Sequence, residues 1–397
     1  MPSFLENSSI KKTLQFFQQP AVIVIVSCVI SILISIQLIV ATKVDPKPGW
    51  PTRYNNYEIF SNSFLHLLEN KDLYTIYPEE HYDYYKYSPS FPVFMLPFAM
   101  LPDWLGLNLW NLLNVLVLIF AILKIPYFLP PIRAAICYLI LPEVIISVQN
   151  SQCNALLAGL AIWTFILLEK NRLIAASILV VMSAYIKIFG VLLFIIFLFY
   201  KNYFKSFSAV LISAIIIGIL PLFFIDLNQL IFLYKSWLHL LSWDYNDSIG
   251  LSVQGWLQTW FHFTPASIFI LLVGIISLLL PIFQFNKWSN TSFKINYLAT
   301  ILIWLVIFNH KAESPTFVIA FTGVLLWYFN SQKRNWETIL FLFAFMLVSL
   351  SPTDLFPRYL LNEWVKPYVL KAVSCIAIYV VLIFELIRKK NSTTQLN

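Results

Sequence analysis

Charged residues are scarce in this chain. Asp, Glu, Lys and Arg make up only 11% of its 397 residues, whereas apolar types make up 59%. A soluble domain carries about 25% charged residues and cannot bury this much apolar surface. The shortage of charge excludes a soluble globular protein, a disordered tail and a fibrous repeat. It predicts a membrane protein whose spans occupy most of the chain.

Cysteine, histidine and glycine are also scarce. The four cysteines lie in or beside apolar segments without CxxC spacing, which excludes a disulfide framework and a zinc site. The five histidines lack metal-ligand spacing. With only nine glycines, the chain has no Gly-rich phosphate loop, and GxSxG and HExxH are absent. We therefore expect no metal and no cofactor.

The net charge of +7 comes from basic residues in short clusters between apolar runs. Such clusters are typical of loops that fix membrane topology, and so we expect no nucleic-acid partner. The first apolar run, 20–42, is too long for a signal-peptide core and is interpreted as a retained membrane anchor.

The apolar runs predict an all-α polytopic membrane protein with about twelve transmembrane helices, within a range of about 10 to 13. The run 90–125 is too long for one span. Its first part, 90–102, contains Pro97 and Pro102 and is interpreted as a re-entrant or interfacial piece. The predicted segments are 20–42, 90–125, 133–148, 154–168, 173–187, 189–200, 204–225, 265–284, 296–309, 315–330, 337–350 and 367–387.

The basic residues support this segmentation. With a cytoplasmic N-terminus, the inside connections hold 15 of the 26 Lys and Arg residues, and the positive-inside rule is satisfied at every cytoplasmic connection. Both termini are then cytoplasmic. The run 173–200 is either two spans or one helix kinked near Gly190; as a helix, 189–200 is only about 18 Å long. We choose the hairpin, because one span would place Lys201, Lys205 and the 388–390 cluster outside.

The predicted outside connections are long and polar, unlike the inside ones. They are 43–89, 149–153, 226–264, 309–314 and 351–366, within a single domain over 1–397. Since no internal repeat is visible, chemistry is expected on the outer face alone.

In the first outer loop, Tyr57, Phe60, Phe64, Leu67 and Leu68 fit one face of a helix. The opposite side carries Asn55, Glu58, Asn62, His66 and Glu69. This pattern predicts a helix on the membrane surface, either as a structural lid or as a lid that offers Glu58 or Asn56 to a lipid head group.

Three further positions have two interpretations each. Asp83 lies where the chain re-enters the membrane, and it is either a general base with a raised pKa or the partner of Lys86. The amides in QNSQCN (149–154) either bind sugar hydroxyls or cap a helix, with Asn154 or Asn150 as the cap. Lys187, inside an apolar run, either snorkels or meets an anion such as a lipid phosphate.

Two short outer loops complete the polar set. NHKAESPTF (309–317) carries His310, Lys311 and Glu313, and SPTDLFPRYL (351–360) carries Asp354 and Arg358. A guanidinium binds phosphate bidentately, whereas Ser-Pro and Thr-Asp are also ordinary turn formers. Five polar clusters from distant parts of the sequence share one predicted face.

Several stretches carry a family pattern: NKDLYTIYP, YKYSPSFPVFMLPFAMLP, LWNLLNVLVLIFAIL, QNSQCNALLAGLAIW and AASILVVMSAYIKIFGVLLF. The chain resembles the polyprenol-phosphate-sugar-dependent glycosyltransferases of family 87, well over about 50–210 and loosely beyond. The resemblance implies a GT-C-like fold with its active site on the extracytoplasmic side of the cell membrane, in bacteria the inner membrane. It also implies transfer of a mannose-like hexose from a polyprenyl-phosphate sugar to a lipid or glycan acceptor, usually with inversion.

One position departs from the family. An aspartate is usual about eighteen residues before Tyr74, where this chain has Asn56. Asparagine cannot serve as the base. We expect Asp83 first, and then Glu58, to take this role; otherwise Glu313 takes it, or activity is lost. Lys187 matches the family's lysine, although Ile188 follows it instead of proline. We expect the phosphate ligands to be Lys187 and Arg358, with Lys311 and His310, and the sugar or acceptor ligands to be Asn56, Gln149, Gln152 and Asn154.

Two other classes of function stay open at this point. A flippase for a lipid-linked glycan needs polar groups reachable from both faces and often contains repeats, whereas the polarity here is one-sided. An inactive envelope-assembly component would follow if Asn56 marks lost activity.

Overall fold

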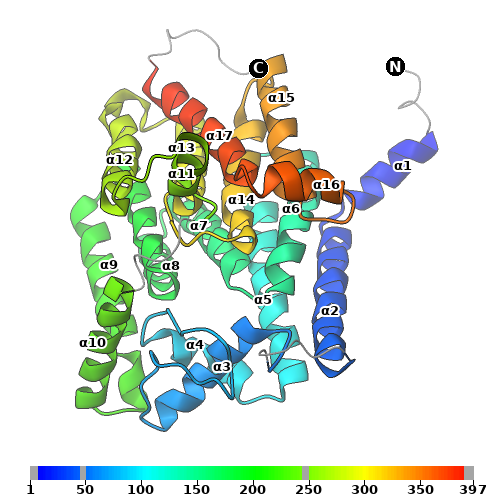
Figure 1. The fold of residues 1–397 in the computed structure, drawn as a ribbon. Helices are drawn as coiled ribbons and strands as arrows, with labels where there is room; N and C mark the ends of the chain where they lie inside the picture. The colour runs from blue at the N-terminus through cyan, green and yellow to red at the C-terminus, as the bar shows by residue number, and fades with distance from the viewer. Residues whose placement is uncertain (1–7, 45–50, 244–249, 389–397) are drawn as a thin grey trace. The chain divides into compact units, whose positions relative to one another are not determined.

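The computed structural model describes residues 8–44, 51–243 and 250–388, which form helices joined by turns and contain no strand (Figure 1). The chain divides into two compact units, which are described separately. Unit 1 comprises Met1–Ser248 and Glu313–Ile319, and unit 2 comprises Ile249–Ala312 and Ala320–Asn397. Lys389, Lys390 and parts of the predicted loops 43–89 and 226–264 lie outside the described residues. The single domain over 1–397 stays a prediction.

Unit 1 is a row of packed helices. In it, α5 packs against α2 and α7, α7 packs against α8, and α8 packs against α9. The close approach of α7 to α5 depends on Gly159, because a Cβ there would lie 2.8 Å from the Leu118 nitrogen. The helices of unit 1 are α1 (Ser8–Phe17), α2 (Pro20–Val44), α3 (Asn55–Leu68), α4 (Phe91–Ala99), α5 (Asp103–Lys124), α6 (Pro130–Gln149), α7 (Asn154–Glu169), α8 (Leu173–Ile186), η1 (Ile188–Phe199), α9 (Tyr203–Gly218), η2 (Leu220–Phe223), α10 (Leu227–Trp243) and η5 (Ser314–Thr316).

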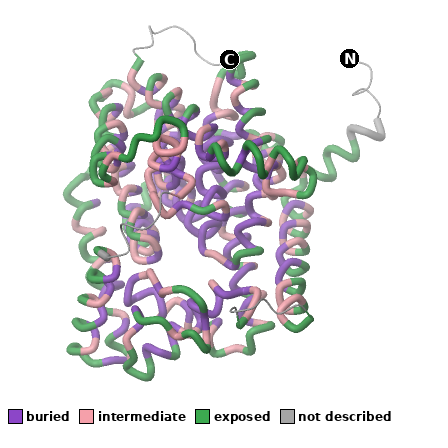
Figure 2. Tube along the Cα trace, in the orientation of Figure 1, coloured by how far each residue is buried: buried purple, intermediate pink, exposed green. Residues whose placement is uncertain are grey.

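Burial differs strongly along this row (Figure 2). Most of α7 is buried, whereas α2 and α9 present exposed apolar side chains such as Leu33 and Phe207. Exposed apolar side chains on long helices are expected where a helix faces lipid.

The chain turns back at Lys187. This residue is extended, with φ −134° and ψ 122°, and separates α8 from η1. The two segments pack against each other so closely that a Cβ on Gly190 would lie 2.5 Å from the Ser183 backbone. A single kinked helix could not bring these positions together, so the structure favours the hairpin.

The second segment of this hairpin, η1, is longer than expected. Because η1 is a 3₁₀-helix with a rise of about 2 Å per residue, its 12 residues extend about 24 Å instead of the expected 18 Å.

The first loop contains the predicted helix, α3, which packs on α4. Tyr57, Phe60, Phe64 and Leu67 are buried, as expected, whereas Leu68 is exposed. Three polar residues on the opposite side of the helix, Asn55, Glu58 and His66, are buried as well. The cause is the segment 72–82, which folds over this side: Asn55 Oδ1 accepts a hydrogen bond from the Tyr82 nitrogen at 2.8 Å.

Unit 2 is also helical. Its central pair is α13 and α17, and α17 packs further against α11, α15 and η6. The elements are α11 (Val253–Phe261), α12 (Ser267–Leu279), η3 (Leu280–Phe283), η4 (Phe285–Lys287), α13 (Thr291–Ile307), α14 (Phe317–Asn330, whose first turn belongs to unit 1), α15 (Asn335–Ala344), η6 (Phe345–Leu350, a π-helix), α16 (Arg358–Leu360), η7 (Leu361–Val365, a π-helix) and α17 (Leu370–Ile387).

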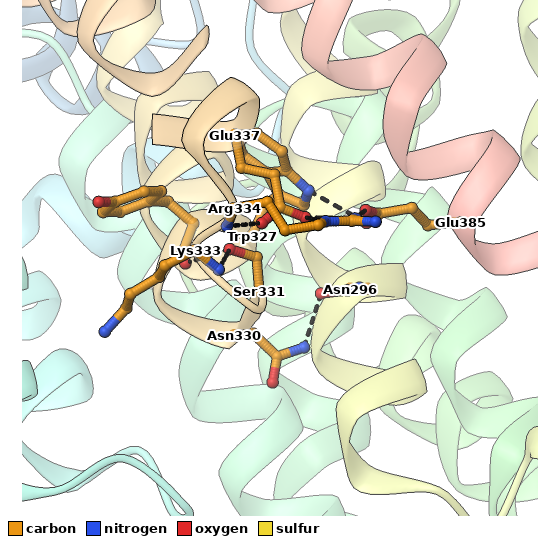
Figure 3. Close-up of polar contacts among 9 residues, drawn as sticks. Asn296, Trp327, Asn330, Ser331, Lys333, Arg334, Glu337 and Glu385 are labelled. Atoms are coloured by element: carbon orange, nitrogen blue, oxygen red, sulfur yellow. Dashed lines mark hydrogen bonds and ion pairs between the residues drawn. The ribbon is translucent and has the colours of Figure 1, made fainter. Parts of the chain in front are cut away.

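In unit 2, Arg334 contacts Glu337 and Glu385, and all three are assigned to predicted inside connections (Figure 3). Arg334 donates to the buried Glu337 at 3.0 Å through Nε and to Glu385 at 3.2 Å. The Trp327 indole also donates to Glu385, at 3.2 Å. In unit 1, Tyr127 from a predicted inside connection and Tyr200 at the end of the predicted span 189–200 both donate to Glu169. Within each unit, residues assigned to different inside connections thus contact one another, and the side of the membrane that they face stays a prediction.

Helix lengths agree with a membrane protein. Among the described residues, five helical stretches are long and apolar enough to cross a membrane: Pro20–Val44, Asp103–Lys124, Pro130–Gln149, Tyr203–Phe223 and Leu370–Ile387. Seven shorter apolar helices coincide with the remaining predicted segments. The number of crossings stays a prediction.

Candidate active site

A chain of hydrogen bonds joins four of the predicted site residues. Lys187 Nζ donates to Asn154 Oδ1 at 2.8 Å, and Asn154 Nδ2 donates to Gln152 Oε1. Gln152 Nε2 in turn donates to Glu313 Oε2 at 3.3 Å. We call these four residues the polar chain. It places a cation and a carboxylate at the two ends of a pair of amides.

Three helix ends position the polar chain, all within unit 1. Lys187 ends α8, Gln152 lies in the turn between α6 and α7, and Glu313 precedes η5. The second donor hydrogen of Asn154 binds the Pro315 carbonyl at 3.0 Å, which fixes the turn of η5 against the start of α7. The amide of Asn154 is fully buried and makes no cap bond. The capping interpretation of Asn154 is therefore wrong, because its side chain is used to hold Lys187 and η5.

Asn56 lies against the same turn. Its Nδ2 donates to the Asn150 carbonyl at 2.9 Å, and so α3 of the first loop is tied to the turn between α6 and α7. An aspartate at this position has no hydrogen to donate and would place its charge against a carbonyl oxygen. The Asn56 amide thus holds α3 against the turn between α6 and α7, which an aspartate could not do. Asn150 itself donates to Ile146 at the end of α6, and Gln149 is exposed one residue earlier.

Asp83 lies outside the polar chain. It is exposed, and its Oδ1 is 3.3 Å from Lys86 Nζ, so the predicted ion pair is present. The Lys86 carbonyl accepts a hydrogen bond from the Trp237 indole at 3.3 Å, which ties this part of the loop to α10.

Glu58 lines a separate pocket of about 220 Å³ on the covered side of α3. Burial, and then the negative charges of Asp103 and Glu80, raise the pKa of Glu58 to about 8. Burial also lowers the pKa of His66, whose Nε2 lies 2.8 Å from Glu80 Oε2. The pocket is lined by Thr52, Glu58, Asn62, Leu65, His66, Glu69, Lys71 and Glu80.

The raised pKa of Glu58 predicts a pH-dependent stability. The folded protein holds this proton up to about pH 8, whereas an unfolded glutamate loses it near pH 4.5. Folding stability therefore falls as the pH rises through this window, on the order of 5 kcal/mol in total. Glu58→Gln mimics the protonated form. We expect its thermal midpoint to equal that of the wild type at pH 5 and to exceed it by several degrees at pH 8.5.

Intrinsic tryptophan fluorescence during heating in detergent measures this difference. The matched control is Glu79→Gln, because Glu79 is exposed in the same loop and does not line the pocket. A Glu58→Gln midpoint that follows the wild type at both pH values would show that Glu58 ionises normally.

The remaining predicted residues belong to unit 2. The loop with His310 and Lys311 packs on the segment that begins at Gly250: the Leu251 nitrogen donates to the Ala312 carbonyl at 2.8 Å. Arg358 donates to Asp354 at 2.8 Å, and both side chains are more than four-fifths exposed. No group of three metal-ligating side chains occurs within 8–44, 51–243 and 250–388.

Sequence reasoning missed Glu143. This residue is fully buried in the middle of α6, directly after Pro142. The signal was available, because an ionisable residue inside an apolar segment is a candidate functional group by default. The pairing of His66 with Glu80 was also missed, since nothing in the sequence joins a helix face to a loop residue fourteen positions later.

The apolar helices, with a charged and amide-rich site at helix ends, define a membrane protein with a polar reaction or binding site. The model of glycosyltransferase family 87 matches residues 85–352, about two thirds of the chain, and the chain belongs to this family. The match includes Gln149, Gln152, Asn154, Lys187, His310, Lys311 and Glu313. It begins after Asn56, Glu58 and Asp83 and ends before Arg358. A comparison with curated proteins gave no match.

Proposed function

We propose that this glycosyltransferase transfers a mannose-like hexose from a polyprenyl-phosphate sugar to a lipid or glycan acceptor, with inversion, at the polar chain. Family membership supports glycosyl transfer. The observation that carries the rest is the hydrogen-bonded connection from Lys187 through Asn154 and Gln152 to Glu313.

Lys187 is the proposed phosphate ligand. An ammonium has three donor hydrogens, and the bond to Asn154 uses one of them. The other two hydrogens can bind oxygens of the donor phosphate. As the bond from the sugar C1 to the phosphate oxygen breaks, that oxygen gains negative charge, which a cation held in place stabilises.

Glu313 is the proposed general base. It takes the proton of the acceptor hydroxyl while the acceptor oxygen forms its bond to C1, and polyprenyl phosphate leaves with the displaced electron pair. Glu313 is exposed and can reach an acceptor, while Gln152 holds one of its oxygens. Asp83 and Glu58 are weaker candidates, because Asp83 is paired with Lys86 and Glu58 lies in the pocket on another side of α3 from Asn56.

The other predicted ligands keep their proposed roles. Gln152 and the exposed Gln149 offer amides to sugar hydroxyls, and Asn56 holds the first loop against them. Arg358, Lys311 and His310 are proposed as further phosphate ligands. The positive-inside pattern supports an extracytoplasmic site, since the polar chain joins predicted outside connections.

Sugar transfer by the purified full chain in liposomes tests this function. The liposomes receive a panel of labelled polyprenyl-phosphate hexoses and a lipid extract from the host, and protein-free liposomes serve as the control. We expect label to move from one donor into a new lipid or glycan. Donor that binds but is never consumed, with or without appearing in the opposite leaflet, would contradict the proposal and favour a flippase or an assembly component.

A further inference from the structure

We propose that the pocket between α3 and the segment covering it binds a primary ammonium group, carried by a lipid head group or by an amino sugar. This site is distinct from the polar chain and goes beyond the proposed transfer reaction. It is formed by residues that no part of the proposed mechanism uses, apart from the alternative base Glu58.

The first argument is the state of Glu58. Its side chain is more than nine-tenths buried and lines the pocket, yet no residue within the described ranges forms a hydrogen bond with its carboxyl group. A buried carboxyl without a partner is costly, and a ligand that donates hydrogen bonds removes this cost. Thr52 Oγ1 is a buried pocket atom without a partner among the residues that the structure describes.

The second argument is charge. The two basic side chains of the pocket already have carboxylate partners: Lys71 Nζ lies 2.6 Å from Glu69 Oε2, and His66 Nε2 lies 2.8 Å from Glu80 Oε2. The charges that act on Glu58 are those of Asp103 and Glu80, and both are negative. The field at Glu58 therefore attracts a cation and repels a phosphate.

The third argument is size and shape. At about 220 Å³ the pocket lies below the range of about 300 to 1,000 Å³ that holds drug-sized ligands. A compact ammonium with three donor hydrogens fits such a site, and the oxygens of Glu58, Thr52 and Asn62 are its available acceptors. A planar guanidinium needs a paired carboxylate geometry instead.

Ligand-observed nuclear magnetic resonance on the full chain in a non-ionic detergent at pH 7 tests the site. The probes are methylammonium, ethanolamine and glucosamine, and the uncharged matches are ethylene glycol and glucose. We expect the amines to bind at least about tenfold more tightly than their matches. Equal binding of glucosamine and glucose would overturn the proposal.

Two variants locate the binding. When an ammonium binds, Glu58 can release its proton to solvent and meet the cation as a carboxylate, which a glutamine cannot do. Glu58→Gln keeps the shape of the side chain and should therefore weaken methylammonium binding at least about tenfold, and Thr52→Val should weaken it by a smaller factor. Glu79→Gln is the matched control and should bind like the wild type. Amine binding that survives Glu58→Gln unchanged would place the amine elsewhere and reject this site.

Competition experiments in nanodiscs distinguish the two possible sources of the ammonium group. If phosphatidylethanolamine, but not phosphatidylglycerol, competes with methylammonium, the ligand is a lipid head group. If only glucosamine competes, it is an amino sugar. Loss of transfer activity would not affect these binding measurements, so they are independent of the proposed reaction.

Discussion

Lys187→Met is expected to lower kcat/KM for sugar transfer by about 10² to 10³, because it removes the cation proposed to stabilise the departing phosphate. The position supports a large effect. Lys187 lies at the turn between α8 and η1, where Asn154 holds its Nζ at 2.8 Å. A charge fixed in this way needs no reorganisation when the leaving group develops its own charge. Initial rates at varied donor concentration, with each variant in liposomes, measure the change.

Two further variants distinguish loss of the positive charge from a packing defect as the cause of a lower rate. Lys187→Arg keeps the cation and should recover part of the rate, although a guanidinium cannot reproduce the same bond to Asn154. Lys235→Met is the matched control, because Lys235 is an exposed lysine on α10 of the same unit. Equal rates for Lys187→Met and Lys235→Met would remove Lys187 from the site. A loss that Lys187→Arg does not relieve at all would point to a packing defect instead.

The helical segments could be predicted because they depend on local signals. Apolar runs gave the positions of the predicted segments to within a few residues, and the sidedness of the basic residues favoured a hairpin for 173–200. The 3₁₀ geometry of η1 was not predictable, since it follows from the packing of η1 against α8 at Gly190. Periodicity likewise gave the buried side of α3 but not the cover over its polar side, which depends on the contact from Asn55 to Tyr82.

The candidate site was predictable as a set of residue types and not as a geometry. Lys187, Asn154, Gln152 and Glu313 were each selected as polar residues beside apolar runs. Their order in one chain of bonds depends on a contact between residues 161 positions apart, from Gln152 to Glu313. The sequence ranked Asp83 first as the base because of its place at the re-entry point. The structure shows Asp83 paired with Lys86 and brings Glu313 to the amides instead.

Glu313→Gln is expected to lower kcat by about 10² to 10⁴ while leaving the donor KM nearly unchanged, because it removes only the proton acceptor. The substitution suits this question, since a glutamine oxygen can still accept the hydrogen bond from Gln152 and preserve the polar chain.

The exposed Glu79→Gln is again the matched control. Turnover at saturating donor, measured beside donor binding, distinguishes the outcomes: a variant that binds donor normally but fails in turnover identifies the base. Full turnover by Glu313→Gln, with loss in Asp83→Asn or Glu58→Gln, would transfer the role to that carboxylate. It would also mean that the acceptor approaches from the first loop.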